Sequence, residues 1–267
     1  MTEEHRVIRP DYARRIEAFR LLDDTFLSTV FDNRPKLAEK MLRIVLGRDD
    51  IEVLDVKAQV RIPNLLDHDL VLDILAQDAN GKKYDIEVQR SSAGASPQRA
   101  RYHLALIDAR SLTKGSPFTD LRENYVIFFT EEDTRQKNLP LSEVSRLWTD
   151  TKEPFGDGSH ILYVNGAYQP ETGEETELTK LIHDFRCTAP EEMQIPEIAE
   201  QVFYYKRTEG GQEAMCRIME EFAEEQREAT LIETIKKLME NMKWTADQAM
   251  KAIGLPEEEQ KKLREKL

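Results

Sequence analysis

Acidic residues occupy unusual positions in the segment LDILAQDANGKKYDIEVQR, residues 72–90. Asp73 lies among aliphatic residues, and Glu87 and Gln89 lie two apart in the stretch that follows the turn-forming DANG. Side chains two apart on a β-strand point to the same face of the sheet. If the loop is residues 79–81, Asp73 lies opposite Glu87 on the neighbouring strand. Two directly opposed carboxylates repel each other unless a cation lies between them.

A carboxylate pair of this kind has two interpretations. Hard divalent cations such as Mg²⁺ bind carboxylate oxygens and waters, and a bound one lowers the pKa of water and polarises a phosphate oxygen. Alternatively, the hairpin has one solvated polar face, which is common in antiparallel sheets. Asp73 fits the second interpretation poorly, because Leu72, Ile74 and Leu75 around it are all apolar.

A basic segment follows the hairpin. The sequence QRARY at 98–102 predicts a helix with Gln98 and Tyr102 four apart on one face, flanked by Arg99 and Arg101. Arginine binds phosphate through paired hydrogen bonds, so this helix suits a phosphodiester held beside an acidic metal site. An ordinary amphipathic helix with Tyr102 in the core is the simpler alternative.

The composition limits the class of protein. The net charge of −13 over 267 residues argues against a protein that coats nucleic acid, although basic residues gather between Gln89 and Ser116 and permit transient contact with a polyanion. No apolar run reaches the roughly 18 residues of a membrane span, and the first residues have no apolar core of a signal sequence. Cys187 and Cys216 form no metal-ligand pattern and fit a reducing compartment. We therefore expect a cytoplasmic protein with no membrane segment.

The elements that must position these residues alternate between helix and strand. Hydrophobic spacing and caps predict helices over 11–22, after Asp23 or Asp24, over 35–46, and from Pro97 to about Leu112. Strands are predicted over 51–62, 69–77, 83–89, 124–130 and 160–166. Helices over 175–186, 195–207, 211–241, 245–253 and 256–266 complete the chain. We expect a nuclease-like α/β domain over 1–185 and a charged helical region over 186–267.

The helical tail offers two further interpretations. The segment TADQAMKAIGLPEEEQKKL at 245–263 has the form of a helix-turn-helix, but its second helix begins with three glutamates, which repel phosphate. A partial apolar stripe in the preceding helix favours packing on its own domain or a two-fold contact between copies, which makes a homodimer a possible assembly. The stripe consists of Ile218, Phe222, Leu231, Ile235, Leu238 and Met242.

The order of these motifs resembles the PD-(D/E)XK nuclease superfamily, and more closely the bacterial PD-(D/E)XK nuclease family transposases, also described as recombination-promoting nucleases (Rpn family). The matching segments are DDTFLSTVF, LDILAQDANGKKYDIEVQR, QRARYHLALIDARSL, ENYVIFFT and GSHILYVNG, with LIHDFRC and KWTADQAMKAIGLPEEE in the tail. The resemblance covers about residues 20–250. It implies a restriction-endonuclease-like mixed β-sheet core flanked by helices, with a helical C-terminal tail.

The resemblance also implies roles for individual residues. Asp73 and Glu87 match the two metal-binding acids, and Gln98 and Tyr102 match a Gln-xxx-Tyr element that supports the site. Gln89 stands where many members of the superfamily have lysine; it can position the attacking water but supplies no charge.

Two further groups of residues are expected around the site, the first from its charge and the second from the resemblance. The arginines expected to contact DNA phosphates are Arg90, Arg99 and Arg101. An early helical acid sometimes joins the metal site in this superfamily, and here Asp24 and Glu17 are equal candidates. The histidines form no motif, and His68 and His103, which flank the site in sequence, are expected to be incidental.

These observations predict a Mg²⁺-dependent endonuclease, with Mn²⁺ as a possible replacement, that hydrolyses DNA in recombination or transposition. The alternative is a catalytically weak or inactive nuclease-fold scaffold that binds a protein partner through its tail. The overall acidity and the glutamine at position 89 favour that alternative. A third possibility is a nuclease that acts on RNA, since a site that grips phosphate does not by itself choose the sugar.

Overall fold

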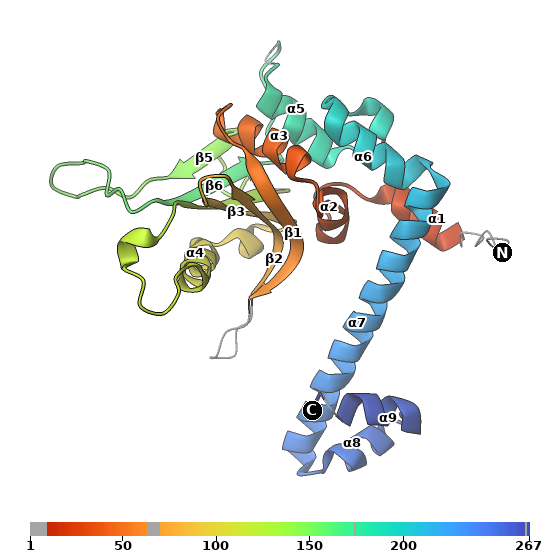
Figure 1. Cartoon of the computed structure of the whole chain (residues 1–267). Coiled ribbons are helices and arrows are strands. Elements are labelled where there is room, and N and C mark those ends of the chain that lie inside the picture. Colours follow the sequence, from red (N-terminus) through yellow and green to blue (C-terminus); the bar gives the residue numbers. More distant parts are fainter. Residues whose placement is uncertain (1–9, 63–69, 174, 265) are drawn as a thin grey trace. The chain divides into compact units, whose positions relative to one another are not determined.

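The computed structural model, which describes residues 10–62, 70–173, 175–264 and 266–267, is built around a mixed β-sheet (Figure 1). The strands are β1 (Val53–Ile62), β2 (Leu70–Asp78), β3 (Lys83–Gln89), β4 (Asn124–Thr130), β5 (Leu141–Val144) and β6 (Ser159–Asn165). They lie in the order β1-β2-β3-β4-β6-β5. Strands β1, β2 and β3 are antiparallel, β3, β4 and β6 are parallel, and β5 is antiparallel to β6.

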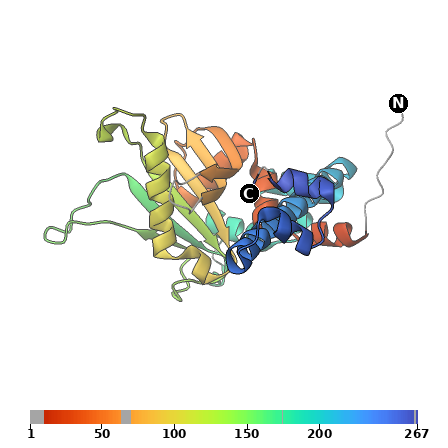
Figure 2. The same ribbon diagram turned by 90° about the horizontal axis from the view of Figure 1, so that it is seen from below.

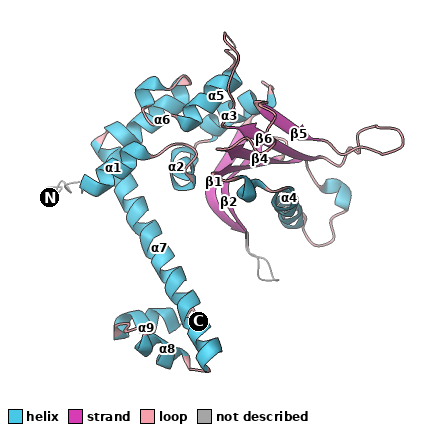
Figure 3. Ribbon diagram, turned by 180° about the vertical axis from the view of Figure 1, so that it is seen from behind, coloured by secondary structure: helices cyan, strands magenta, loops and turns pink. Residues whose placement is uncertain are grey.

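Helices cover both faces of this sheet. Figure 2 shows α4 (Pro97–Ser111) along one face, where a core includes Leu104, Ile107, Val126 and Phe128. Figure 3 shows α2 (Asp24–Phe31), α3 (Pro35–Leu46) and α5 (Glu177–Arg186) away from α4. On their face Phe129 stacks on Phe185 of α5, with 4.0 Å between ring centroids. Strand β4 is therefore buried along its whole length, as expected for a parallel strand between two helical layers.

The predicted α/β class is confirmed, with two local differences. Helix α1 (Pro10–Ala18) is shorter than the expected 11–22, because the chain turns at Asp23, whose carboxylate accepts the N–H of Arg20 at 2.7 Å. Strand β5 was not predicted, since its four residues are exposed or half-buried and have no apolar pattern. Residue 69, the first of the predicted second strand, lies outside the described residues.

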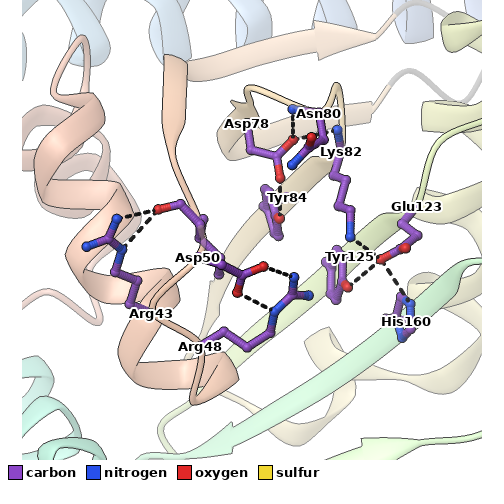
Figure 4. A network of polar contacts seen from close by, with 11 residues as sticks. Arg43, Arg48, Asp50, Asp78, Asn80, Lys82, Tyr84, Glu123, Tyr125 and His160 are labelled. Atoms are coloured by element: carbon purple, nitrogen blue, oxygen red, sulfur yellow. Dashed lines mark hydrogen bonds and ion pairs between the residues drawn. The ribbon is translucent and has the colours of Figure 1, made fainter.

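Asp78 fixes the turn between β2 and β3. Its Oδ1 accepts the backbone N–H groups of Asn80 and Lys82, both at 2.9 Å, and its Oδ2 accepts the hydroxyl of Tyr84 at 3.0 Å (Figure 4). Gly81 has a φ of 78°, a conformation that glycine adopts without strain. A buried carboxylate with three donors thus holds the reversal of the chain in one conformation.

This turn sets the register that matters for function. Ile74 lies opposite Ile86 in the ladder between β2 and β3. The next pair along the same register is Asp73 and Glu87, as the sequence predicted. A shift of one residue would move every side chain of β3 to the other face of the sheet.

A stack of rings joins the parallel strands on the face that Tyr84 occupies. Tyr84 stacks on Tyr125 at 4.9 Å, and Tyr125 on His160 at 4.3 Å, so the stack crosses β3, β4 and β6. Glu123 accepts hydrogen bonds from the Tyr125 hydroxyl and the Lys82 ammonium, both at 2.8 Å (Figure 4). Burial raises the pKa of both tyrosines, so their hydroxyls stay protonated donors.

The chain divides into two compact units, one over residues 9–211 and the other including 212–267. The first contains the sheet and also α6 (Pro196–Arg207), which lies beyond the boundary expected at residue 185. The expected division at that residue stays a prediction. In the second unit the end of α7 (Glu209–Met242) packs with α8 (Ala246–Ala252) and α9 (Glu257–Arg264). Their shared core includes Ile235, Met250 and Leu263, so the tail has a hydrophobic core of its own.

We predict that Asp78→Ala lowers the free energy of unfolding by about 1–3 kcal/mol, because it leaves two N–H groups and a buried hydroxyl without their acceptor. Tyr84→Phe removes only the hydroxyl and should cost less. Asp55→Ala is the matched control, since Asp55 is exposed on the neighbouring strand and forms an exposed ion pair with Lys57. Urea denaturation measures all three. Equal losses for Asp78→Ala and Asp55→Ala would contradict this role of the turn.

Candidate active site

Strands β2 and β3 change their mode of pairing at Asp73. The Asp73 backbone N–H donates to Glu87 Oε1 at 2.9 Å, and Asp73 Oδ2 accepts the backbone N–H of Val88 at 2.9 Å. Each strand thus provides one carboxylate that accepts a backbone N–H of the other strand. In a regular ladder a backbone carbonyl would accept that hydrogen bond. We call this arrangement the Asp73–Glu87 exchange. It holds both acids at fixed positions between the two strands.

Strand β2 is irregular at the same residue. Leu72 and Leu75 belong to the same core beneath α4 although they are three residues apart, which strict alternation does not allow. On β1, Ala58 pairs with Ile74 and Val60 pairs with Leu72, so Gln59 lies at the level of Asp73. Its φ of 50° is not that of a regular strand. The hydroxyl of Ser28 on α2 donates to the Asp73 carbonyl at 3.2 Å. The irregularity of β2 is therefore matched by its neighbouring strand and held by α2.

The acids of the hairpin are withdrawn from water. Asp85 and Glu87 have no exposed surface, and Asp73 is 9% exposed. Burial raises the pKa of Asp73 to about 6 and that of Asp85 to about 8. Burial, reinforced by the charges of Asp85 and Asp73, holds the pKa of Glu87 well above its usual range. Burial and mutual repulsion thus disfavour the ionised forms of three neighbouring carboxyl groups, and a bound cation would favour them.

Helix α4 brings basic groups to these acids. The Ser96 hydroxyl caps the helix by accepting the N–H of Arg99 at 3.2 Å, and Pro97 occupies the first turn. Arg99 Nη2 lies 3.4 Å from Glu87 Oε2, and its Nε donates to His103 Nε2 at 3.2 Å. His103 Nδ1 lies 2.7 Å from Asp85 Oδ2. Since Nε2 is an acceptor, the imidazole proton is on Nδ1 and is donated to Asp85. Burial lowers the pKa of His103, which favours this neutral form.

The other residues expected on this helix lie elsewhere around it. Gln98 and Arg101 are exposed, and Tyr102 is half-buried. The residues that contact the acids, Arg99 and His103, are each one position further along the helix than Gln98 and Tyr102. The role of Gln98 and Tyr102 in support of the site stays a prediction.

The end of β3 presents its two polar residues to different surroundings. Gln89 shares a face with Glu87 and packs against Gly94, where an added Cβ would lie 1.9 Å from Gln89 Oε1. Arg90 points to the other side, where it pairs with Glu131 at 3.2 Å and Asp23 at 3.4 Å. Gln89 therefore lies on the strand face of Glu87 with its amide against Gly94, whereas Arg90 is held by Glu131 and Asp23.

The structure separates the two candidates for an early helical acid. Asp24 begins α2, and its charge contributes to the raised pKa of Asp73, so the two carboxylates lie near each other. Glu17 forms an ion pair with Arg207 on α6. Asp24 is thus the early acid with a position beside the hairpin.

Two residues of the site were not expected from the sequence. Asp85 was not among the site residues predicted from the sequence, and His103 was expected to be incidental, yet the two are hydrogen-bonded to each other and both are fully buried. The available signals were that Asp85 lies two residues before Glu87 on the same face, and that His103 follows Arg99 by four residues on a helix. His68, the other histidine near the motif, lies outside the described residues.

The donor set fits a divalent cation. One ligand atom each from Asp85, Glu87 and His103 lie within 4.8 Å of one another, and Asp73 exchanges hydrogen bonds with the Glu87 strand beside them. Within the described part of the chain, Asp85 Oδ1 is buried without a hydrogen-bond partner. Carboxylate oxygens suit Mg²⁺ and Mn²⁺, whereas both ring nitrogens of His103 are engaged in hydrogen bonds, one with Arg99 and one with Asp85.

Comparison with known protein families gives the same assignment as the motifs. Residues 37–250 match the family model described as PD-(D/E)XK nuclease family transposase. Neither the curated proteins nor the solved structures gave a match. The matched range contains the hairpin, α4 and the parallel strands, and it confirms the family that the sequence resembles. The chain belongs to the PD-(D/E)XK nuclease family transposases.

Proposed function

We propose that the protein is a Mg²⁺- or Mn²⁺-dependent endonuclease that hydrolyses phosphodiester bonds of DNA during recombination or transposition. The observation that carries this proposal is the Asp73–Glu87 exchange, which fixes two buried carboxylates side by side on adjacent strands. Membership of a nuclease family supports the class of reaction.

Each acidic residue has a distinct part in this proposal. Asp73 and Glu87 hold the cation, and Asp24 and Asp85 add negative charge around it. A bound divalent cation lowers the pKa of a water molecule and withdraws charge from the phosphate. Gln89 orients the attacking water through its amide. Hydrolysis joins the water oxygen to phosphorus and breaks the bond to one sugar oxygen, which leaves as a hydroxyl group.

The basic residues of α4 serve the substrate. Arg101 is exposed and Arg99 is partly exposed, so both can reach a phosphate backbone. Arg90 is also exposed but shares its charge with Glu131 and Asp23, so we expect a weaker contribution to DNA affinity. The chain carries a net charge of −13, so binding should depend on this local basic surface and fall steeply with salt.

A scaffold without catalysis is the second candidate. The glutamine at position 89 favours it, because many members of the superfamily have lysine there. Under this alternative the helical unit over 212–267 binds a partner, and the acids of the hairpin bind no metal. A homodimer through these helices and a cytoplasmic location both stay predictions. Across the described ranges, no helix combines the length and apolar character that a bilayer span needs.

We predict that the wild-type protein nicks supercoiled plasmid with Mg²⁺ or Mn²⁺, and that Asp73→Ala lowers the rate by about 100-fold or more, as loss of an essential charged group does. Asp55→Ala, exposed on β1, should cleave like wild type. Parallel assays with single-stranded RNA test the sugar preference. Purified protein that cleaves no DNA with any divalent metal, or cleavage unaffected by Asp73→Ala, would contradict the proposal.

We also predict that a divalent cation stabilises the protein more at pH 8 than at pH 5.5. The pKa is raised to about 6 for Asp73 and about 8 for Asp85 in the folded protein, whereas unfolded aspartates titrate near 4. The folded state therefore binds more protons between about pH 4 and 8, and metal-free stability falls as pH rises through that window.

Calorimetric melting with and without Mn²⁺ measures this effect. At pH 8 the carboxyl groups have lost most of their protons and are free to bind the cation, so the rise in Tm should be about 5 °C or more. At pH 5.5 protons compete with the cation for the same groups, so the rise should be smaller. Asp73→Asn should reduce the shift at pH 8. A scaffold whose hairpin binds no metal would show no shift at either pH.

A third prediction concerns Gln89. Gly94→Ala places a methyl group where the Gln89 amide lies, so the amide must move although it remains present. We expect the cleavage rate to fall about 10-fold, with Mn²⁺ affinity unchanged because the acids are untouched. Ala93→Ser, at the exposed neighbouring position, is the control. A Gly94→Ala variant with the wild-type rate would argue against an orienting role for Gln89.

A further inference from the structure

The glutamine at position 89 raises the question of which residue supplies positive charge to the site. Three cations near the hairpin are engaged elsewhere. Lys82 donates to Glu123 at 2.8 Å, and Lys83 donates to the Ser111 hydroxyl at 2.9 Å. Arg90 pairs with acids on the other side of β3. None of these contacts directs charge toward Glu87.

Arg99 has the position that these residues lack. Its Nη2 lies 3.4 Å from Glu87 Oε2, and Glu87 is one of the two acids that hold the cation in the proposed function. The Arg99 side chain is 39% exposed, whereas Glu87 is fully buried. The guanidinium therefore contacts the buried carboxylate and can also be reached by a substrate from solvent. Among the described residues, its contacts to Glu87 and His103 use two of the five N–H donors that a guanidinium has.

A buried pair behind Arg99 fixes this orientation. His103 accepts from Arg99 Nε at 3.2 Å and donates to Asp85 at 2.7 Å, and neither His103 nor Asp85 has exposed surface. The ring of Phe128 lies against the imidazole, with 5.9 Å between centroids. A flexible arginine on a helix surface would lose side-chain entropy on each turnover, whereas a guanidinium held at Nε and Nη2 is already ordered.

We propose that Arg99 supplies from α4 the positive charge that lysine supplies from the strand in other members of the superfamily, and that His103 and Asp85 are positioning residues that hold its guanidinium. This inference rests on the proposed nuclease function. It changes the expected role of Arg99 from a general phosphate contact to a catalytic group, which stabilises charge that develops on the phosphate during hydrolysis.

The two roles of Arg99 predict different kinetics. A general contact contributes equally to the bound substrate and to the transition state, so its loss weakens DNA binding and leaves the rate at saturation unchanged. A catalytic cation contributes mainly in the transition state, so its loss lowers the rate at saturation and changes the Kd little.

The test compares Arg99→Gln, Arg99→Lys and Arg99→Ala with the matched control Arg110→Gln, an exposed arginine in the last turn of the same helix. The assay is single-turnover cleavage of a DNA duplex at saturating protein with Mn²⁺, and the Kd is measured with Ca²⁺ in place of Mn²⁺. We expect Arg99→Gln to lower the rate about 100-fold or more, with the Kd changed less than about threefold. Arg99→Lys should recover part of the rate, and Arg110→Gln should cleave like wild type.

Chemical rescue separates catalysis from folding. Added guanidinium at tens of millimolar concentration should restore part of the rate of Arg99→Ala, because the small cation can occupy the space of the lost side chain. It should leave the rates of wild type and Arg110→Gln unchanged. A variant that is inactive because it is misfolded would not be rescued.

The positioning role is tested at His103. His103→Leu removes the acceptor for Arg99 Nε and should lower the saturating rate about 10-fold without changing the DNA Kd. His103→Gln, whose amide oxygen can accept the same hydrogen bond, should recover part of that rate. If both variants lose the same fraction of the saturating rate, and that fraction matches the fall in their Tm, the role of His103 is purely structural and this part of the inference is overturned.

The outcomes for the two proposals are distinct. Wild type that cleaves and Asp73→Ala that does not, together with an Arg99→Gln variant that keeps the wild-type saturating rate, would overturn the role of Arg99 and leave the nuclease function intact. An Arg99→Gln variant with a raised Kd alone would make Arg99 a general phosphate contact. Wild type that cleaves no DNA would overturn both proposals.

Discussion

The Asp73–Glu87 exchange is the interaction on which the rest of the site depends. Each carboxylate accepts a backbone N–H of the opposite strand, so neither acid can move without breaking the sheet. Burial of two like charges is costly, and the surrounding structure offsets that cost with fixed contacts. Asp78 holds the register, Ser28 holds the carbonyl of Asp73, and Arg99 places a positive charge 3.4 Å from Glu87. The sheet, α2 and α4 can therefore be understood as supports for one pair of acids.

Most elements were predictable because local patterns and packing agree. The buried parallel strand β4 is a continuous apolar run, and α3 begins at Pro35 and ends at Gly47, whose φ of 60° suits a helix end. Strand β5 could not be predicted, since its exposed residues become a strand only by pairing with β6. The shortened α1 depends on the hydrogen bond of Asp23 to a backbone N–H, which helical periodicity does not reveal.

The candidate site was predictable to the extent that strand geometry defines it. Opposition of Asp73 and Glu87 followed from the length of one turn. The contacts of Arg99 and His103 with the acids were not predictable, because the apolar residues of α4 do not define one narrow face and a step of one residue along a helix rotates the face by about 100°. Gln98 and Tyr102 each lie one residue before this pair, and their support of the site stays a prediction. Burial of Asp85 depends on the position of this helix over the sheet, which no single segment encodes.

The hairpin also has a consequence for the order of folding. Asp73 and Glu87 meet across 14 residues, whereas β3 finds β4 only after a longer loop that contains α4. Contacts between residues close in sequence form first, because they close the smallest loop. The repulsion between the two acids therefore acts on an early step of assembly, and Arg99, which is only 12 residues from Glu87, can offset part of it at that stage. Divalent ions should then act on the speed at which the chain folds as well as on its final stability.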